Sequence, residues 1–322
     1  MTLAVKLDIE NEVRRADARI GNLKRETPLD HSLVLSEIHG CICHVKLENL
    51  QHTGSFKVRG ALNKLIALQA RGAASTVVTA STGNHGAAVA YAARATGMEA
   101  VVFLPKDAPP TKVEAVRRLG ATIERFGDDP VEAEVRARQY AEAKRLPYVS
   151  PYNDRRVIGG QGTIAVELKR QAEKIDAVFV AVGGGGLIAG IAGYLKPKFP
   201  EAEFIGCSPI NSPVMYKSVQ SGRIITMRSE PTLSDGTAGG VESGSITFKP
   251  CRDLVDDWVL VTEQEIEEAM RLFMDAHHMM IEGAAGTALA AYLKIGRRFA
   301  AMNVIIIVCG ANIEPETLKG VL

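Results

Sequence analysis

The sequence has few cysteines, almost no net charge and no long apolar run, and each shortage excludes a class of protein. Its five cysteines are odd in number and scattered through 322 residues, which argues against a disulfide-stabilised secreted domain and predicts a reducing, cytoplasmic setting. A net charge of +1 gives no basic surface for nucleic acid or for an anionic membrane. No apolar stretch reaches membrane-spanning length, and residues 1–20 mix acidic with basic side chains. We therefore predict an amphipathic helix there rather than a signal peptide.

Cysteine is also too sparse to support a metal site. Cys41, Cys43 and His44 lie close together in CICHVKLE, which alternates like a strand and places both cysteines on one face. A zinc site of this type needs a second pair of ligands at a suitable spacing, and none follows. We therefore predict no metal at this stretch.

Short β-branched runs alternate with helical patterns along most of the chain. Hydrophobic residues make up 46% of the sequence, which is enough for a sizeable core and for two lobes. The runs are apolar throughout, which indicates parallel strands covered by helices on both faces. The sequence thus predicts a doubly wound α/β fold. The expected strands are residues 76–80, 99–105, 176–182, 202–208 and 303–310.

The order of these runs predicts two domains. Residues 71–153 have the pattern of a small βαβα unit, and we expect it to be inserted into a larger domain made of residues 1–70 and 154–322. A cleft between two such lobes is the usual place for a ligand.

A run of four glycines, Gly183–Gly186, follows one expected strand and opens a helical pattern. Glycines allow backbone N–H groups to approach an anion closely, and a helix N-terminus favours negative charge. A tight turn needs one or two glycines, so four favour phosphate binding. The spacing lacks the dinucleotide fingerprint, and Leu187 stands where a Walker loop has lysine. We therefore expect a small phosphorylated cofactor.

Two other stretches carry polar groups at the boundary between a loop and a helix. STGNHG, residues 81–86, offers two hydroxyls, the amide of Asn84 and backbone donors, a set that suits a carboxylate or a ring oxygen. His85 alone is weak evidence, because a single histidine in a loop is more often structural. In HTGSFKVRGAL, Lys57 lies between Phe56 and Val58. It is either a solvated residue at a helix start or an amine held in an apolar pocket.

These three stretches, in this order, resemble those of the fold-type II pyridoxal-phosphate enzymes, closest to the threonine/serine dehydratase and serine racemase group. The chain is also similar to the dehydratase of hydroxyectoine utilisation. The resemblance covers nearly the whole chain and extends to GQGTIAVEL, SDGTAGG, IEGAAG and VCGANI. It implies two doubly wound α/β lobes, as in the tryptophan synthase β subunit, with pyridoxal 5'-phosphate in the cleft between them. It also implies a homodimer or homotetramer.

The resemblance assigns a role to individual residues. Lys57 is the expected Schiff-base lysine and the base that takes the substrate Cα proton, since burial disfavours the charged amine. Asn84 is expected at the ring oxygen of the cofactor, Phe56 beside the ring and Cys309 at the pyridine nitrogen. A neutral partner at that nitrogen favours β-elimination over transamination. The phosphate is expected to contact Gly183, Gly184, Gly185, Gly186 and Leu187.

The substrate is expected to be bound by residues from two loops. The carboxylate should contact Ser81, Thr82, Asn84 and His85, and Thr82 is a second catalytic candidate. Serine racemases have serine at that position and many dehydratases have alanine, so its hydroxyl keeps racemisation open. Asp235 and Gly236 are expected either to line the side-chain pocket or to form a turn.

Besides Thr82, the sequence departs from the group at the positions where cation-dependent members bind a metal ion. Ser208 stands where cation-dependent members place an acidic ligand, and Pro213 and Val214 stand where another acid is usual. We therefore expect no cation site.

The implied reaction converts a β-hydroxy-α-amino acid to a 2-keto acid and ammonia, with L-threonine and L-serine as the first expectations. Bulkier substrates, from hydroxyectoine catabolism, phenylserine or 3-hydroxyaspartate, remain open, as does an amino-acid racemase. Arg155 and Arg156 either bind an acidic substrate or are surface charges, and we favour surface charges. Two further hypotheses are a dinucleotide oxidoreductase, disfavoured by the glycine spacing, and a cofactor-binding regulatory protein, disfavoured by the intact Lys57 and Asn84.

Overall fold

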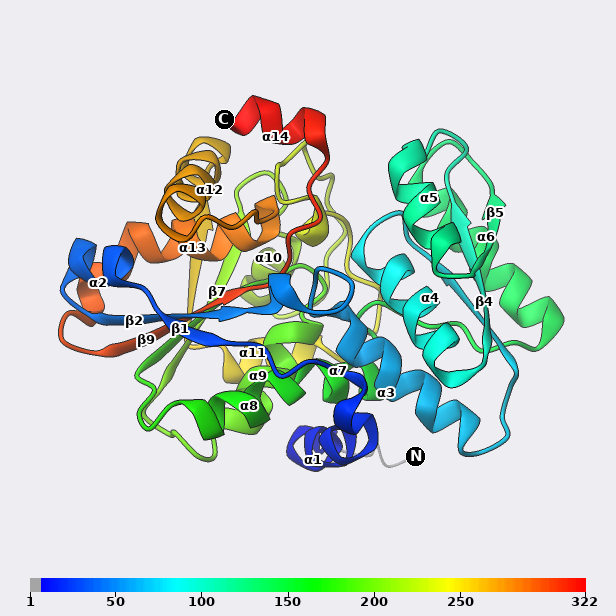
Figure 1. The fold of residues 1–322 in the computed structure, drawn as a ribbon, viewed down its shortest axis with the longest axis horizontal. Helices are drawn as coiled ribbons and strands as arrows, with labels where there is room; N and C mark the ends of the chain where they lie inside the picture. The colour runs from blue at the N-terminus through cyan, green and yellow to red at the C-terminus, as the bar shows by residue number, and fades with distance from the viewer. Residues whose placement is uncertain (1–6) are drawn as a thin grey trace.

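Two β-sheets of different size organise the chain (Figure 1). The computed structural model describes residues 7–322, so the predicted N-terminal helix is seen as α1 (Ile9–Ile20), and residues 1–6 lie outside the described part. The larger sheet has the strand order β1-β2-β9-β6-β7-β8 and the smaller has β3-β4-β5. The strands of the larger sheet are β1 (Leu29–His31), β2 (Ile42–Leu47), β6 (Ala177–Ala181), β7 (Glu203–Pro209), β8 (Asp257–Val261) and β9 (Asn303–Val308). Those of the smaller are β3 (Thr76–Ala80), β4 (Glu99–Leu104) and β5 (Thr122–Arg125).

Parallel pairing dominates both sheets, and only β1 pairs antiparallel, with β2. β9 lies between β2 and β6, so that Ile306 pairs with Val45 on one side and Phe179 on the other. Its residues from Val304 onward are fully or almost fully buried, as apolar runs covered on both faces should be. The prediction of a doubly wound parallel α/β fold is confirmed.

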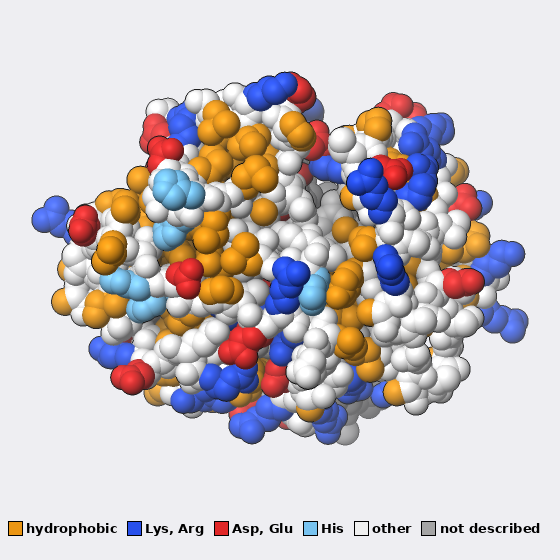
Figure 2. Space-filling model, in the orientation of Figure 1, with side chains coloured by type: hydrophobic (Ala, Val, Ile, Leu, Met, Phe, Trp, Pro, Cys, Tyr) orange, Lys and Arg blue, Asp and Glu red, His pale blue; other side chains and the backbone are white. Residues whose placement is uncertain are grey.

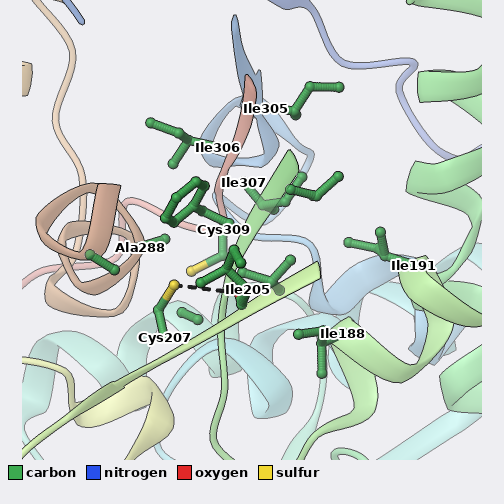
Figure 3. Close-up of a cluster of buried hydrophobic side chains, with 14 of the residues drawn as sticks. Ile188, Ile191, Ile205, Cys207, Ala288, Ile305, Ile306, Ile307 and Cys309 are labelled. Carbon is green, nitrogen blue, oxygen red and sulfur yellow. Dashed lines mark hydrogen bonds between the residues drawn. The ribbon is translucent and has the colours of Figure 1, made fainter. Parts of the chain in front are cut away.

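Helices cover the larger sheet on both sides. α13 (Gly283–Ile295) packs on β6 and β9 from one side, and α9 (Gly186–Leu195) packs on β6 and β7 from the other. Figure 3 shows Ile188 and Ile191 of α9 and Ala288 of α13 converging on strand residues Ile205 and Ile306. The other helices around this sheet are α2 (Leu33–His39), α7 (Arg155–Gln161), α8 (Thr163–Gln171), α10 (Val214–Gln220), α11 (Phe248–Leu254), α12 (Glu263–His277) and α14 (Pro315–Val321). Four single 3-10 turns are η1 (Gly21–Leu23), η2 (Glu48–Leu50), η3 (Asp235–Thr237) and η4 (Gly296–Phe299).

Four more helices surround the smaller sheet. They are α3 (Lys57–Gln69), α4 (Asn84–Thr96), α5 (Pro110–Arg118) and α6 (Pro130–Lys144). α3 packs against α4 and also against α7, and its apolar residues share one core with those of β3 and β4. The helix therefore belongs to the packing of both lobes, and the domain boundary near residue 70 stays a prediction.

A buried ionic cluster fixes the start of α3 to the larger lobe. Arg59 is fully buried and donates to both carboxyl oxygens of Glu48 and of Glu167, at 2.6 to 2.9 Å. Lys46 is also fully buried, and its Nζ lies 2.7 Å from Glu167 Oε2. Lys24 Nζ also lies 3.7 Å from Glu167 Oε1 and 3.1 Å from Asp17 Oδ1, so three cations face three carboxylates. The cluster is therefore neutral and well hydrogen-bonded, which buried charges require.

Arg156 corrects one of the sequence predictions, because it is not a surface charge. Its side chain is buried, and Nη1 lies 3.0 and 3.1 Å from the two carboxyl oxygens of Glu12. Only Arg155 is exposed, with its Nε 3.8 Å from the same carboxyl group. Sequence position alone did not reveal that α1 brings an acidic residue onto α7.

No helix among residues 7–322 combines the length and the apolar character that crossing a membrane requires.

Candidate active site

A cavity of about 990 Å³ opens where the carboxyl ends of the strands of both sheets meet. β3 ends at Ala80 and runs into STGNHG, β6 ends at Ala181 and runs into the four glycines, and β9 ends just before Cys309. All three segments line the cavity, together with Lys57. Figure 2 shows a notch in the surface between α14 and α5, on the side where these loops gather. The topology thus brings four separate sequence signals to one place.

Lys57 is the first residue of α3 and lines this cavity. The backbone before it is held in place, because Phe56 N–H donates to the Cys309 carbonyl at 3.1 Å. Its Nζ lies 3.4 Å from the Pro151 carbonyl oxygen and 5.0 Å from the centre of the Phe56 ring. Burial lowers the pKa of Lys57 to about 8, against the opposing attraction of Cys309 and Glu282. About a tenth of this amine is therefore neutral and nucleophilic at pH 7, far more than for an ordinary lysine.

Three of the four glycines, Gly183 to Gly185, each have a separate steric reason to lack a side chain. A Cβ on Gly183 would lie 2.7 Å from the Thr237 carbonyl oxygen, and one on Gly184 would lie 2.3 Å from the ring of Tyr152. Gly185 has φ +81°, and a Cβ there would meet the Cys251 sulfur at 2.5 Å. The run therefore passes through a narrow space between neighbouring side chains and then opens α9 into the cavity. The first N–H groups of α9 have no partner within the helix, which suits an anion.

Alanine at Gly184 should disturb this loop far more than alanine at an exposed glycine with open space around it. We expect Gly184→Ala to weaken binding of a phosphate-bearing ligand at least about tenfold, because moving the Tyr152 ring displaces the loop. Gly222→Ala is the matched control, since Gly222 has φ +69° with nothing within 4 Å, and it should cost only about 1 kcal/mol of stability. Equilibrium dialysis against the cofactor and thermal unfolding measure the two effects. Equal affinities in both variants contradict the expectation.

STGNHG divides into a short loop and the first turn of α4, with Asn84 as the first helical residue. The Ser81 hydroxyl accepts from Gly83 N–H at 3.2 Å, and Thr82 lines the cavity. The Asn84 side chain is part of a network, with Nδ2 2.9 Å from both carboxyl oxygens of Glu282 and Oδ1 accepting from Asn312. The unpaired N–H groups of the first turn of α4 point to an anion site at this end of the cavity.

The resemblance implied that the His85 side chain would contact the substrate carboxylate, whereas the structure shows the ring bound to a backbone carbonyl. The ring is buried, and its Nε2 lies 2.9 Å from the Val149 carbonyl oxygen, so that this nitrogen carries the proton and donates it. Burial and the nearby Lys57 lower the pKa of His85 to about 3, which keeps the ring neutral. The ring N–H is thus already used, and what His85 offers an anion is its backbone N–H in the first turn of α4.

Cys309 lines the cavity directly after β9. Figure 3 shows Cys309 among the buried side chains of the core formed by β7, β9 and their covering helices. Burial raises the pKa of the Cys309 thiol well above its ordinary value, and Glu282 adds to this effect. The group is therefore a neutral thiol, in line with both sequence interpretations, a core cysteine and a residue facing a ligand.

Asp235 and Gly236 form a 3-10 turn and also line the cavity, and their place beside a substrate side chain stays a prediction. The structure adds Lys112 of α5, which the sequence had not singled out. Its Nζ lies 2.9 Å from Glu314 Oε1 and 3.6 Å from Asp235 Oδ2. These contacts join the smaller lobe to the larger one at the edge of the cavity.

Three further cavity residues had no distinctive sequence signal: Tyr152, Glu282 and Asn312. The Tyr152 hydroxyl accepts from Glu242 N–H at 2.9 Å, which ties its ring over the glycine loop. Glu282 stands in IEGAAG, a stretch noted only for its resemblance. Tertiary structure alone reveals these three residues, because each depends on contacts with segments far away in the chain.

The segment around Ser208 carries no acidic side chain toward its neighbours. Ser208 is fully buried, and its hydroxyl donates to the Val182 carbonyl at 3.1 Å. Within residues 7–322, no group of three or more His, Cys, Asp or Glu side chains is arranged to hold a metal ion.

Comparison with known proteins gives consistent results. The family described as pyridoxal-phosphate dependent enzyme matches residues 20–310. The chain is 36% identical over 312 residues to an L-threonine ammonia-lyase of Thermotoga maritima, covering 97% of this chain and 77% of that protein. It is 34% identical over 315 residues to a serine racemase of Dictyostelium discoideum, covering 97% of both. The solved structure of the processed form of threonine deaminase isoform 2 from Solanum lycopersicum matches with a TM-score of 0.92 at 33% identity, covering 98% of this chain and 92% of that one.

Proposed function

Because the chain belongs to the pyridoxal-phosphate dependent enzyme family and has the type II fold of that family, we propose that it is a dehydratase of β-hydroxy-α-amino acids. In this proposal it converts L-threonine or L-serine to a 2-keto acid and ammonia. Relatives named threonine ammonia-lyase support the reaction class. The observation that carries the proposal is the arrangement around one cavity of the Lys57 amine, the glycine loop and the first turn of α4.

The residues that line the cavity fit pyridoxal phosphate. A partly neutral lysine amine suits a covalent bond to an aldehyde, and the glycine loop at the start of α9 suits a phosphate. In the proposed arrangement, Gly183, Gly184, Gly185, Gly186 and Leu187 bind the phosphate. Phe56 packs beside the ring, Asn84 donates to the ring oxygen and the neutral thiol of Cys309 faces the ring nitrogen. All of these residues line the same cavity.

When bound, pyridoxal phosphate supplies an electron sink that stabilises negative charge at the substrate Cα. The protein's part is to place a base beside that carbon and to hold the substrate still. Lys57 is the proposed base, since its lowered pKa leaves a neutral amine able to accept the Cα proton near neutral pH. Its position at the first turn of α3, fixed by the Phe56–Cys309 hydrogen bond, keeps the amine in the lining of the cavity.

The substrate carboxylate is proposed to bind at the first turn of α4. The side chains of Ser81, Thr82 and Asn84 and the backbone N–H of His85 line or border this end of the cavity. Helix N-termini favour carboxylates. Asp235 and Gly236 then lie beside the substrate side chain.

Racemisation is the second candidate, because Thr82 lines the cavity and a relative is named serine racemase. A racemase needs an acid on the face of Cα opposite Lys57, and the Thr82 hydroxyl is the proposed group. A homodimer or homotetramer in the cytoplasm is also part of the proposal. Exposed apolar residues on α2, Leu33, Val34 and Ile38, support an interface between copies, and five free cysteines support a reducing compartment.

The experiment that tests the proposal measures keto-acid release by purified, pyridoxal-phosphate-loaded protein. The panel contains L-threonine, L-serine, threo-3-hydroxyaspartate, threo-phenylserine and the hydroxy amino acid of hydroxyectoine catabolism, with D-enantiomers as controls. We expect turnover of L-threonine or L-serine. If the Thr82 hydroxyl takes part in the reaction, Thr82→Ala should lower the rate of product formation at least about tenfold. Production of D-serine without keto acid favours the racemase instead. No product from any substrate contradicts both.

A further inference from the structure

Glu282 is a buried carboxyl group that lines the cavity and has no cationic ion-pair partner in the described part of the chain. Only 3% of the residue is exposed, and none of the ion pairs found among residues 7–322 includes it. Glu48 and Glu167, the other fully buried glutamates of the larger lobe, are by contrast each paired with Arg59. An unpaired buried carboxylate is costly, so this position needs a reason beyond packing.

The neighbours of Glu282 leave space for its carboxyl group and orient it. A Cβ on Gly310 would lie 2.7 to 2.8 Å from the carboxyl atoms, so this glycine makes room for it. The backbone N–H of Asn312 donates to Oε2 at 3.0 Å, and Glu282 N–H donates to the Gly310 carbonyl at 3.0 Å. The carboxyl group therefore has one fixed position, facing Asn84.

This contact decides which way the Asn84 amide points. Asn84 Nδ2 lies 2.9 Å from both carboxyl oxygens of Glu282, while its Oδ1 accepts from Asn312 Nδ2 at 2.5 Å. Asn312 Nδ2 also donates to the Thr53 carbonyl at 2.8 Å, which fixes the orientation of its own amide. The chain of contacts from Thr53 to Glu282 thus leaves Asn84 a single orientation, with one N–H shared between the two Glu282 oxygens and the other free for a ligand.

The charge of this carboxyl group is also set by its surroundings. Burial raises the pKa of Glu282 to about 7; the Asn84 hydrogen bond opposes this, and Asp235 adds to it. The Asn312 N–H and Lys57 favour the ionised form. The titratable groups that face Glu282 are Lys57 from α3, Asp235 from η3 and the neutral thiol of Cys309 after β9. None of them replaces the missing ion-pair partner.

We propose that Glu282 is a positioning residue of the cofactor site, which orients the Asn84 amide and takes up a proton when the anionic cofactor binds beside it. This inference rests on the proposed function, in which Asn84 donates to the ring oxygen of pyridoxal phosphate. A negatively charged ligand next to the carboxyl group favours the protonated acid, because that form carries no charge. Binding of the ligand and binding of a proton are therefore coupled at this residue.

The coupling fixes the sign of a pH effect. Below pH 7, Glu282 is already protonated and cofactor binding takes up no proton there. Above pH 7, the cofactor-free protein has lost that proton and must regain it on binding, so cofactor affinity falls as the pH rises. The fall can reach tenfold per pH unit until the higher pKa of the bound state is passed.

The test measures cofactor affinity rather than turnover. Holoenzyme is dialysed against graded pyridoxal phosphate at pH 6.5 and at pH 8.5, for the wild-type protein and for Glu282→Gln. We expect the dissociation constant of the wild type to rise at least about tenfold more between these pH values than that of the variant. Titration of Lys57 and of free pyridoxal phosphate occurs in both proteins, so the difference belongs to Glu282. Glu314→Gln, which removes a carboxylate paired with Lys112 at the edge of the cavity, should behave as the wild type.

The inference is overturned if the cofactor affinity of the wild type and of Glu282→Gln depends equally on pH. It is also overturned if Glu314→Gln loses the pH dependence to the same extent as Glu282→Gln. If Glu282→Gln does not fold, Glu282→Asp keeps an acid but withdraws it from Asn84. The inference then expects the pH midpoint of affinity to move by at least about half a unit, and an unchanged midpoint overturns it. Keto-acid release is measured in a separate experiment. If cofactor affinity proves independent of Glu282, the results with the substrate panel still stand. If no substrate of the panel reacts, the pH dependence of cofactor affinity can still be measured.

Discussion

Replacing Lys57 with alanine is expected to lower keto-acid release by about 10⁴-fold or more, the largest effect of any single change in the cavity. The variant loses the amine that is proposed both to bind the cofactor covalently and to accept the Cα proton. Borohydride should no longer fix pyridoxal phosphate to the protein, which mass spectrometry of the intact chain detects. Because the glycine loop remains, non-covalent cofactor binding should persist at reduced affinity.

Lys64→Ala is the matched control for this prediction. Lys64 lies on the same helix, α3, but outside the cavity, where it pairs with Asp154. It should keep keto-acid release within a fewfold of the wild type and should retain the borohydride-fixed cofactor. Turnover by Lys57→Ala at the wild-type rate, or loss of the covalent cofactor in Lys64→Ala alone, contradicts the assignment.

The second large effect is on stability. Arg59→Ala should lower the free energy of unfolding by about 3–5 kcal/mol, because Glu48 and Glu167 lose their guanidinium partner while both stay fully buried. Lys46 remains near Glu167, but Glu48 has no second cation among its contacts in the described chain. Urea unfolding monitored by circular dichroism measures the change. The cofactor is kept saturating, so that weaker binding does not add to the loss.

Arg14→Ala provides the comparison at an exposed ion pair. Arg14 and Glu10 are 2.8 Å apart on the surface of α1, where solvent and salt screen the pair. We expect the urea midpoint of this variant to stay close to that of the wild type. A similar loss in both variants means that the Arg59 cluster is no better than a surface pair.

The strands that could be predicted from the sequence are those formed by continuous apolar runs. β3, β4, β6, β7 and β9 all coincide with such runs. β5 was missed because it is short and largely exposed, so that its residues show no apolar run. The buried Arg156 was also misjudged, since burial of an arginine depends on Glu12, 144 positions away. Long-range pairing of charges leaves no local pattern.

The candidate site divides in the same way. Lys57, STGNHG and the four glycines stand in compact stretches at the ends of strands, and the structure brings all of them to one cavity. The steric reasons for the glycines could not be read from the sequence, since they depend on Tyr152, Thr237 and Cys251. Glu282 and Lys112 were likewise missed, because the role of a charged side chain depends on the groups that face it in the folded protein.

The position of β9 has a consequence for how the molecule is made. This strand is the last of the chain, yet it lies between β2 and β6 in the middle of the larger sheet, and Cys309 and Gly310 behind it hold Phe56 and Ser55. During synthesis on the ribosome, one edge of β2 and one edge of β6 therefore stay unpaired until β9 emerges, more than a hundred residues after β6. Such non-local pairing slows folding, and the exposed strand edges attract chaperones or aggregate meanwhile. The pocket around Lys57 is accordingly a late product of folding, completed only after residue 310 has left the ribosomal tunnel.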